Sequence, residues 1–94
     1  MDERRELVEI DLSGVTTSGE LQLLLARSLG FPDWYGCNWD AFWDAITGLV
    51  AMPRRLRLIG WDGLAKRLPD DARIMQQLLA EMAATYPDWA AEVE

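Results

Sequence analysis

Asp40 and Asp44 are the residues whose type and spacing most clearly suggest chemistry. They are four positions apart, so on a helix both carboxylates project from one side, where like charges destabilise an isolated helix by roughly 0.2 to 0.5 kcal/mol. The helix dipole offsets part of this cost for Asp40, in the first turn, and less of it for Asp44. Trp34, Tyr35 and Trp43 lie close by in the sequence, and both residue types are favoured at the centres of interfaces. The segment is therefore typical of a surface that binds a basic partner.

A simpler interpretation of the same residues stays open. Aromatic residues at helical spacing usually belong to a core, and aspartates at that spacing often form a solvated face. Trp39, Phe42 and Ile46 form one seam that is expected to pack inward. Trp43 adjoins both that seam and the aspartates, so it is expected at the edge of the core.

Most catalytic chemistry is excluded by residue type. The 94 residues contain no histidine, which rules out a Ser/His/Asp triad, a Cys/His dyad and histidine-ligated zinc. Two carboxylates on one helix face lie on one side of a reacting group, whereas glycosidases need carboxylates that flank it. Cys37 has no basic neighbour in the sequence and is expected to be a small loop residue. A small carboxylate enzyme is the weakest of the candidate functions, and we expect no enzyme activity, no cofactor and no metal.

The charge balance limits the partners. Sixteen acidic residues against nine basic ones give a net charge of −7, which repels nucleic-acid phosphates and anionic membrane surfaces. The basic run at 54, 55 and 57, with Lys66 and Arg67, is expected to be a solvated face that balances nearby acids. The first residues are charged and lack the apolar core of a signal peptide, and a single cysteine suits a reducing compartment. We expect a cytoplasmic protein that binds neither nucleic acid nor membrane.

The first half of the chain predicts a strand followed by a helix. Residues 6–12 alternate apolar and acidic side chains, as a half-buried strand does, until Gly14. Thr17 and Glu20 have the spacing of a capping box, and Gly30 and Pro32 end the helix that it starts. The helix carries a stripe of leucines that faces a core: Leu21, Leu24, Leu25 and Leu29.

The second half predicts two further helices and two strands. A short helix begins at the N-cap Asn38 and ends at Gly48 as its C-terminal cap. Residues 54–59 form a strand closed by Gly60, residues 61–63 form a turn, and residues 64–68 form one or two helical turns. A long helix follows Pro69, and a short final strand includes Trp89 and Val93. The buried face of the long helix is expected to consist of Ile74, Met75, Leu78, Leu79 and Met82.

This order of elements predicts the fold class. Strands alternate with helices, and the crossovers are long enough to make neighbouring strands parallel. We therefore expect a single α/β domain over residues 1–94, with a small three-stranded parallel sheet packed against helices.

Residues 29–48, LGFPDWYGCNWDAFWDAITG, resemble the signature of the barstar family. The shared pattern is a proline, an acid, two aromatics and a glycine, then Asn-x-Asp-Ala-x-Trp-Asp and Thr-Gly, over about twenty consecutive residues. Barstar-like proteins inhibit microbial guanyl-specific ribonucleases, and their fold is a three-stranded parallel sheet with helices. Outside this stretch the resemblance is one of element order.

The resemblance also implies a role for individual residues. Asp44 is the main anchor, which enters the ribonuclease active site where a substrate phosphate would lie, and Asp40 pairs with basic groups nearby. Trp34 takes the position of a tyrosine that covers the enzyme's active-site histidine. The implied partner-binding residues are Trp34, Tyr35, Gly36, Asn38, Asp40, Trp43, Asp44 and Glu81.

Trp43 and Gly36 contribute packing in this scheme, and Asn38 caps the helix. Glu81 is an offset counterpart of a family acid on the late helix. Trp34 departs from the family tyrosine, and Cys37 and Trp39 also stand at positions that usually differ. These departures bear on which ribonuclease is bound.

The function implied is one-to-one inhibition of a barnase-like or other guanyl-specific microbial ribonuclease by the face from Trp34 to Asp44. The alternative is an acidic binding or immunity module for a different basic partner or toxin.

Overall fold

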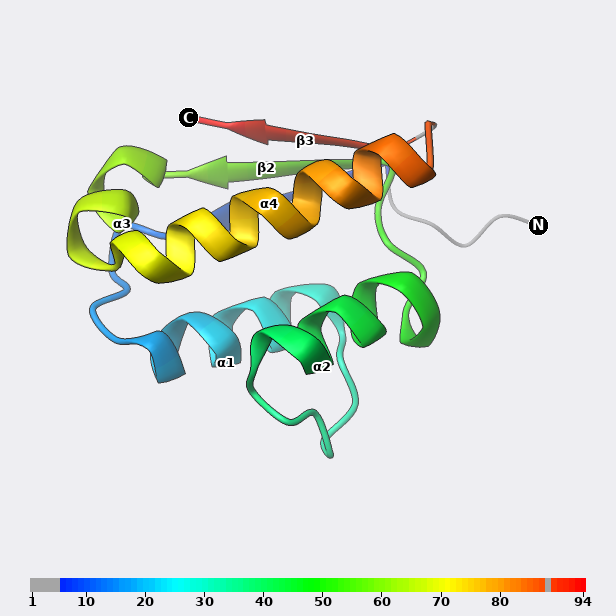
Figure 1. The fold of residues 1–94 in the computed structure, drawn as a ribbon, viewed down its shortest axis with the longest axis horizontal. Coiled ribbons are helices and arrows are strands. Elements are labelled where there is room, and N and C mark those ends of the chain that lie inside the picture. The colour runs from blue at the N-terminus through cyan, green and yellow to red at the C-terminus, as the bar shows by residue number, and fades with distance from the viewer. Residues whose placement is uncertain (1–5, 88) are drawn as a thin grey trace.

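Three parallel strands, in the order β1-β2-β3, form the sheet of this computed structural model, which describes residues 6–87 and 89–94 (Figure 1). The strands are β1 (Leu7–Asp11), β2 (Arg55–Ile59) and β3 (Ala90–Val93). The central strand pairs on both sides, with Val8 opposite Leu56 and Leu56 opposite Ala91. The predicted α/β fold with a three-stranded parallel sheet is confirmed, although each strand is shorter than expected and Trp89 precedes β3.

Helix α1 (Ser18–Leu29) begins and ends as the sequence predicts. Its N-cap Thr17 accepts a hydrogen bond from the Glu20 backbone N–H at 3.1 Å. The Glu20 carboxylate accepts from the hydroxyls of Thr16 at 2.7 Å and Thr17 at 3.2 Å. These hydrogen bonds lower the Glu20 pKa, with the Thr16 contact the larger cause. Gly30 ends the helix at φ 75°, a left-handed conformation that glycine adopts without strain.

Helix α2 (Trp39–Asp44) is continued by one π-helical turn, η1 (Ala45–Leu49). The prediction that Gly48 caps this helix is wrong, because Gly48 lies inside the π-turn and the chain becomes extended at Val50. The Val50 N–H donates to the Ala45 carbonyl oxygen at 3.2 Å, which closes the wider turn. The Thr47 hydroxyl donates to the Trp43 carbonyl at 2.6 Å and so competes with the regular helical ladder at this point.

Helices α3 (Trp61–Arg67) and α4 (Pro69–Thr85) follow β2 almost without a break. The predicted turn at residues 61–63 is wrong, because these residues form the first turn of α3. Gly60, at φ 79°, is the single residue that connects the end of β2 to the start of α3. Pro69 stands at the start of α4, where its missing N–H costs no hydrogen bond, and α4 is the long helix that the sequence predicts.

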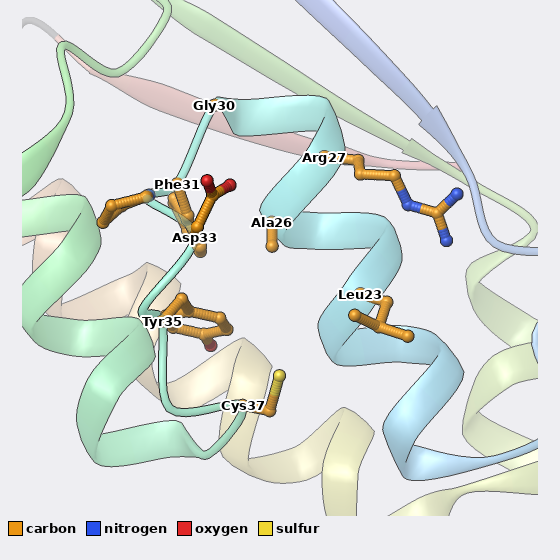
Figure 2. Close-up of a pocket in the computed structure, with 9 residues that line it drawn as sticks. Leu23, Ala26, Arg27, Gly30, Phe31, Asp33, Tyr35 and Cys37 are labelled. Carbon is orange, nitrogen blue, oxygen red and sulfur yellow. The ribbon is translucent and has the colours of Figure 1, made fainter.

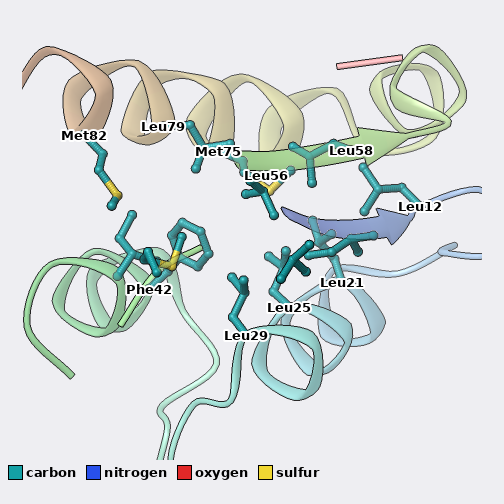
Figure 3. Packing of buried hydrophobic residues seen from close by; sticks show 14 of the residues in the cluster. Leu12, Leu21, Leu25, Leu29, Phe42, Leu56, Leu58, Met75, Leu79 and Met82 are labelled. Atoms are coloured by element: carbon teal, nitrogen blue, oxygen red, sulfur yellow. The ribbon is translucent and has the colours of Figure 1, made fainter. Parts of the chain in front are cut away.

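The hydrophobic core lies where the inner face of the sheet meets α1, α2 and α4 (Figure 3). Helix α4 runs alongside the strands, and α1 and α2 lie together below it in Figures 1 and 3, with α2 also in contact with α4. The leucine stripe of α1 faces inward as predicted, with Leu24 at its edge. The fully buried side chains include Leu12, Leu21, Leu25, Phe42, Leu56, Leu58 and Met75.

The buried face of α4 is narrower than the sequence predicts. Met75, Leu79 and Met82 are buried, but Ile74 and Leu78 are only half-buried. These two residues face α2, where they line a groove. The difference places two apolar side chains next to the aspartates of α2.

The outer face of the sheet carries the basic run, as predicted. Arg55 pairs with Glu92 at 2.7 Å, and Arg57 lies 3.7 Å from carboxylate oxygens of both Glu9 and Glu92. Arg67 differs from the expectation, because its guanidinium donates to backbone carbonyls, including that of Val15 at 2.7 Å. The strand arginines are thus neutralised locally.

Candidate functional site

Asn38 connects the aromatic loop to α2. Its side-chain oxygen accepts the Ala41 N–H at 2.7 Å, which makes it the N-cap that the sequence predicts. Its amide nitrogen donates to the Gly36 carbonyl at 3.2 Å. A Cβ on Gly36 would lie 3.2 Å from that same nitrogen, so the close approach suits glycine. Asn38 and Gly36 therefore fix the shape of the loop, since the Asn38 side chain is bonded to the backbone and Gly36 has none.

Tyr35 holds the loop against α1. Its ring packs on Phe31 with centroids 4.8 Å apart, and its hydroxyl donates to the side-chain oxygen of Gln22. The hydroxyl also lies 3.2 Å from the Asn38 carbonyl oxygen. Burial raises the pKa of Tyr35 to about 12, and the nearby Cys37 thiolate adds to the shift. The hydroxyl of Tyr35, a predicted partner-binding residue, is thus engaged within the protein.

Gln22 supports the loop from α1, and the sequence did not single it out. It is only 2% exposed although its amide is polar, and its hydrogen bond to Tyr35 satisfies its side-chain oxygen. Gln22 lies three positions before Leu25 and seven before Leu29, a spacing that places it beside the leucine stripe, although its polar amide is typical of a solvent-facing position. Only the packing of the loop shows its role.

Figure 2 shows the pocket between the loop and α1, with a volume of about 300 Å³. Tyr35 and Cys37 line it from the loop, and Leu23 and Arg27 line it from α1. Of the predicted partner-binding residues, this pocket contains only Tyr35. Cys37 is exposed and adopts φ 52°, a left-handed conformation that is uncommon outside glycine.

Trp34 is the most exposed of the large apolar side chains, with 72% of its surface accessible. It lies in the loop between α1 and α2, and its side chain takes no part in the core. The core interpretation holds for Trp61 and Trp89, which are buried, while Trp39 and Trp43 are half-buried at the edge of the core. The expectation that Trp39 packs inward is therefore met only in part.

A groove between α2 and α4, with a volume of about 450 Å³, brings most of the predicted charged residues together. Asp40 and Asp44 line it from α2, and Glu81 lines it from α4. Its apolar lining comes from both helices: Trp39, Trp43, Ile74 and Leu78. The groove, which we call the acidic groove, thus combines three carboxylates with two tryptophans and has no basic residue among its described lining.

The sequence predicts one wall of this groove better than the other. Asp40, Trp43 and Asp44 follow from helical spacing, and Glu81 was implied only by the family resemblance. Ile74, Leu78 and Glu81 recur at i, i+4 and i+7, a spacing that could have placed them on one face of α4. The spacing does not predict that this face of α4 packs beside α2.

The described residues hold no group of three or more histidine, cysteine, aspartate or glutamate side chains arranged to bind a metal ion. None of the described helices is both long enough and apolar enough to cross a membrane.

Comparison with known proteins identifies the family. Residues 5–93 match the family described as Barstar (barnase inhibitor). The chain belongs to the barstar family. This is a family of inhibitors and not of enzymes, and its fold is the one described above.

A curated relative in Bacillus subtilis (strain 168) bears the name "Putative ribonuclease inhibitor YrdF". It is 53% identical to this chain over 34 residues, which make up 36% of this chain and 37% of that protein. The match therefore spans little more than a third of the relative. Both comparisons support the family resemblance.

Proposed function

We propose that this protein inhibits a barnase-like, guanyl-specific microbial ribonuclease by occupying its active site in a one-to-one complex. The observation that carries the proposal is the acidic groove, where Asp40 and Asp44 of α2 meet Glu81 of α4 beside two tryptophans. Membership of the barstar family and the name of the Bacillus subtilis relative support it. No catalytic step is needed, because occupancy alone excludes RNA.

The carboxylates are the groups that match such an enzyme. A ribonuclease binds substrate phosphates with arginine and lysine, and a carboxylate satisfies the same donors with short, charge-assisted hydrogen bonds. Asp44 is the proposed main anchor in the phosphate position, while Asp40 and Glu81 pair with neighbouring cations. The half-buried floor of Ile74 and Leu78 suits the aliphatic stem of a long basic side chain.

The loop supplies the remaining contacts. Trp34 is free to cover the enzyme's active-site histidine, since its side chain is largely exposed. Trp43 contributes packing at the edge of the groove. In this proposal Tyr35, Gly36 and Asn38 act mainly by holding the loop in shape.

The test is an RNA-cleavage assay in which this protein is titrated into a small guanyl-specific microbial ribonuclease at low and at physiological salt. We expect cleavage to stop near one equivalent and Asp44→Ala to weaken inhibition strongly. Charge pairs of this kind are known from barnase and barstar, and the loss expected by analogy with that pair is about 2 kcal/mol or more.

The matched control is Asp62→Ala, which removes the same charge from the exposed first turn of α3, away from the groove. It should inhibit as the unchanged protein does. Equal inhibition by Asp44→Ala would contradict the assigned surface. An absence of inhibition by the unchanged protein would favour the alternative, an acidic module for another basic partner or toxin, which a pull-down comparing the protein with its Asp40→Ala/Asp44→Ala variant would then test.

A further inference from the structure

Asp71 joins the first turns of three helices through one oxygen atom. Its Oδ1 accepts a hydrogen bond from the indole Nε1 of Trp39, in α2, at 2.9 Å. The same Oδ1 accepts from the hydroxyl of Ser18, in α1, at 3.0 Å. Asp71 itself lies in the first turn of α4. A single carboxylate therefore connects α1, α2 and α4 at their N-terminal ends.

Helix α2 has little else of its own to fix its position. It has six residues before the π-turn, and an isolated helix shorter than about 12 residues is marginal in water. Phe42 anchors it in the core, where the Trp39 ring packs edge-on against Phe42 with centroids 5.2 Å apart. Ala45 and Ile46 of the following π-turn are also buried, so the buried anchors of this segment lie beyond its first turn. The rotation of the first turn is therefore set by other contacts.

Trp39 supplies such a contact at the start of the helix. The side chain is half-buried, and a buried indole N–H needs an acceptor. With Asp71 as that acceptor, the ring has one favoured orientation. The ring also lines the acidic groove, beside Asp40 and Asp44 and opposite Glu81.

We infer that Asp71 is a positioning residue for the acidic groove: through Trp39 it holds the first turn of α2 against α4 and so sets the spacing between the carboxylates of the two helices. The consequence for binding rests on the proposed function, because a preorganised surface loses less entropy when it binds. The positioning itself is a property of the free protein.

A matched control lies next to Asp71 in the sequence. Asp70 is also in the first turn of α4, so it shares the favourable helix-dipole interaction and the same charge. Asp70 is exposed, and its carboxylate lies 4.0 Å from Arg73 on its own helix. Replacing Asp70 thus reproduces the charge change at Asp71 without touching Trp39.

The first experiment uses the free protein and measures amide hydrogen exchange by mass spectrometry. In Asp71→Ala we expect residues 39–49 to exchange faster by roughly fivefold or more, the equilibrium factor for one ordinary hydrogen bond, while β2 and the later turns of α4 stay protected. Trp39→Phe removes the donor and keeps a ring, so it should produce the same local change. The double variant should add nothing further.

Two variants separate positioning from a general loss of stability. Asp71→Asn keeps a side-chain oxygen as acceptor and should restore slow exchange over residues 39–49, and Asp70→Ala should exchange as the unchanged protein does. Unchanged exchange over residues 39–49 in Asp71→Ala would overturn the inference. So would an equal acceleration across all elements, or the same acceleration in Asp70→Ala.

The second experiment measures dissociation from the ribonuclease. Asp71→Ala should dissociate faster than the unchanged protein, because the spacing of the carboxylates is no longer fixed, and Asp71→Asn should dissociate at close to the original rate. An unchanged dissociation rate in Asp71→Ala would overturn the inference. If the unchanged protein forms no complex, the proposed function fails, and the exchange measurement still decides whether Asp71 positions α2.

Discussion

Tyr35 stabilises the loop between α1 and α2 through contacts within the protein. Its phenol is packed on Phe31, bonded to Gln22 and close to the Asn38 carbonyl oxygen, so the loop is tied to both α1 and the start of α2. A partner that contacts the loop would therefore meet a surface that is already ordered. This arrangement has a measurable consequence at high pH.

We predict that Tyr35 ionises only near pH 12. Burial is the larger cause of its raised pKa and the Cys37 thiolate is the smaller. A raised pKa means that the folded state favours the neutral phenol, so this contribution to stability is complete below the unfolded value of about 10 and is lost as the pH rises towards 12. A titration of tyrosinate absorbance should show this late step.

Two variants check the assignment. Tyr35→Phe should lack the late step, and its free energy of unfolding should fall less between pH 10 and pH 12. Cys37→Ser should lower the Tyr35 pKa by only a small part of its total shift, because it removes the thiolate charge and leaves the burial of the phenol unchanged. A late step that persists in Tyr35→Phe would show that the assignment is wrong.

For single residues, the sequence predicts neighbours that share a helix face, but it does not predict contacts between residues that are far apart in the chain. The i and i+4 spacing of Asp40 and Asp44 is sufficient to place them together. Gln22 and Asp71 look like ordinary helix residues, since their partners, Tyr35 and Trp39, are 13 and 32 positions away. Contacts at such separations depend on how the elements pack.

Among the elements, α2 depends on its N-cap, Asn38. Asn38→Ala should destabilise the protein by about 1 kcal/mol, because the Ala41 N–H loses its acceptor and the Gly36 carbonyl loses its donor. Urea denaturation measures this as a lower midpoint with an unchanged slope. Asn38→Asp keeps the acceptor and should recover most of the loss, and an equal loss in both variants would argue against capping as the cause.

The junction between β2 and α3 depends on Gly60. In Gly60→Ala the new Cβ would lie 3.2 Å from the Ser13 backbone nitrogen, and the residue would keep φ 79°. We predict a destabilisation of about 1 to 2 kcal/mol or more from the left-handed conformation, measured by urea denaturation. Gly14→Ala is the control, since its Cβ would meet nothing within 4 Å. A Gly60→Ala variant as stable as Gly14→Ala would contradict this account.

The surroundings of Gly60 and Gly48 explain the two errors in the predicted elements. Gly60 completes the turn within one residue, so Trp61-Asp62-Gly63 is helical although its composition is typical of a turn. Gly48 resembles a helix cap, yet the Thr47 hydroxyl bonds to the Trp43 carbonyl and the chain passes through a π-turn. In both cases a neighbouring contact overrides local propensity.

For the whole molecule, the order of strands and helices was sufficient to predict a parallel sheet, because long crossovers permit little else. The acidic groove was not predictable in this way. It requires α2 and α4 to pack side by side, and these helices are separated by β2 and α3 in the sequence. Composition gives the net charge of −7 but not where the charge lies.

The arrangement of charge follows from the fold. Arg55 and Arg57 lie on the outer face of the sheet, where Glu9, Glu92 and Glu94 neutralise them. The acidic groove lies on the other side of the core, between α2 and α4, and no basic residue is among its described lining. The acidic groove therefore presents three carboxylates, with no basic residue in its described lining, on the face proposed to meet a basic enzyme.

This arrangement predicts that salt acts on association more than on dissociation. Attraction between the acidic groove and a basic active site extends about 10 Å at 0.1 M salt and about 3 Å at 1 M, so the association rate constant should fall at least about tenfold over that range. Such steering is known for barnase and barstar, and its size is carried over from that pair. Stopped-flow mixing with the ribonuclease measures both rates.

Asp62→Asn should reduce the association rate slightly, whereas Asp44→Asn should mainly speed dissociation, since its carboxylate lies in the contact. Equal effects of these two variants on dissociation, or an association rate that salt leaves unchanged, would mean that the acidic groove is not the surface that meets the enzyme.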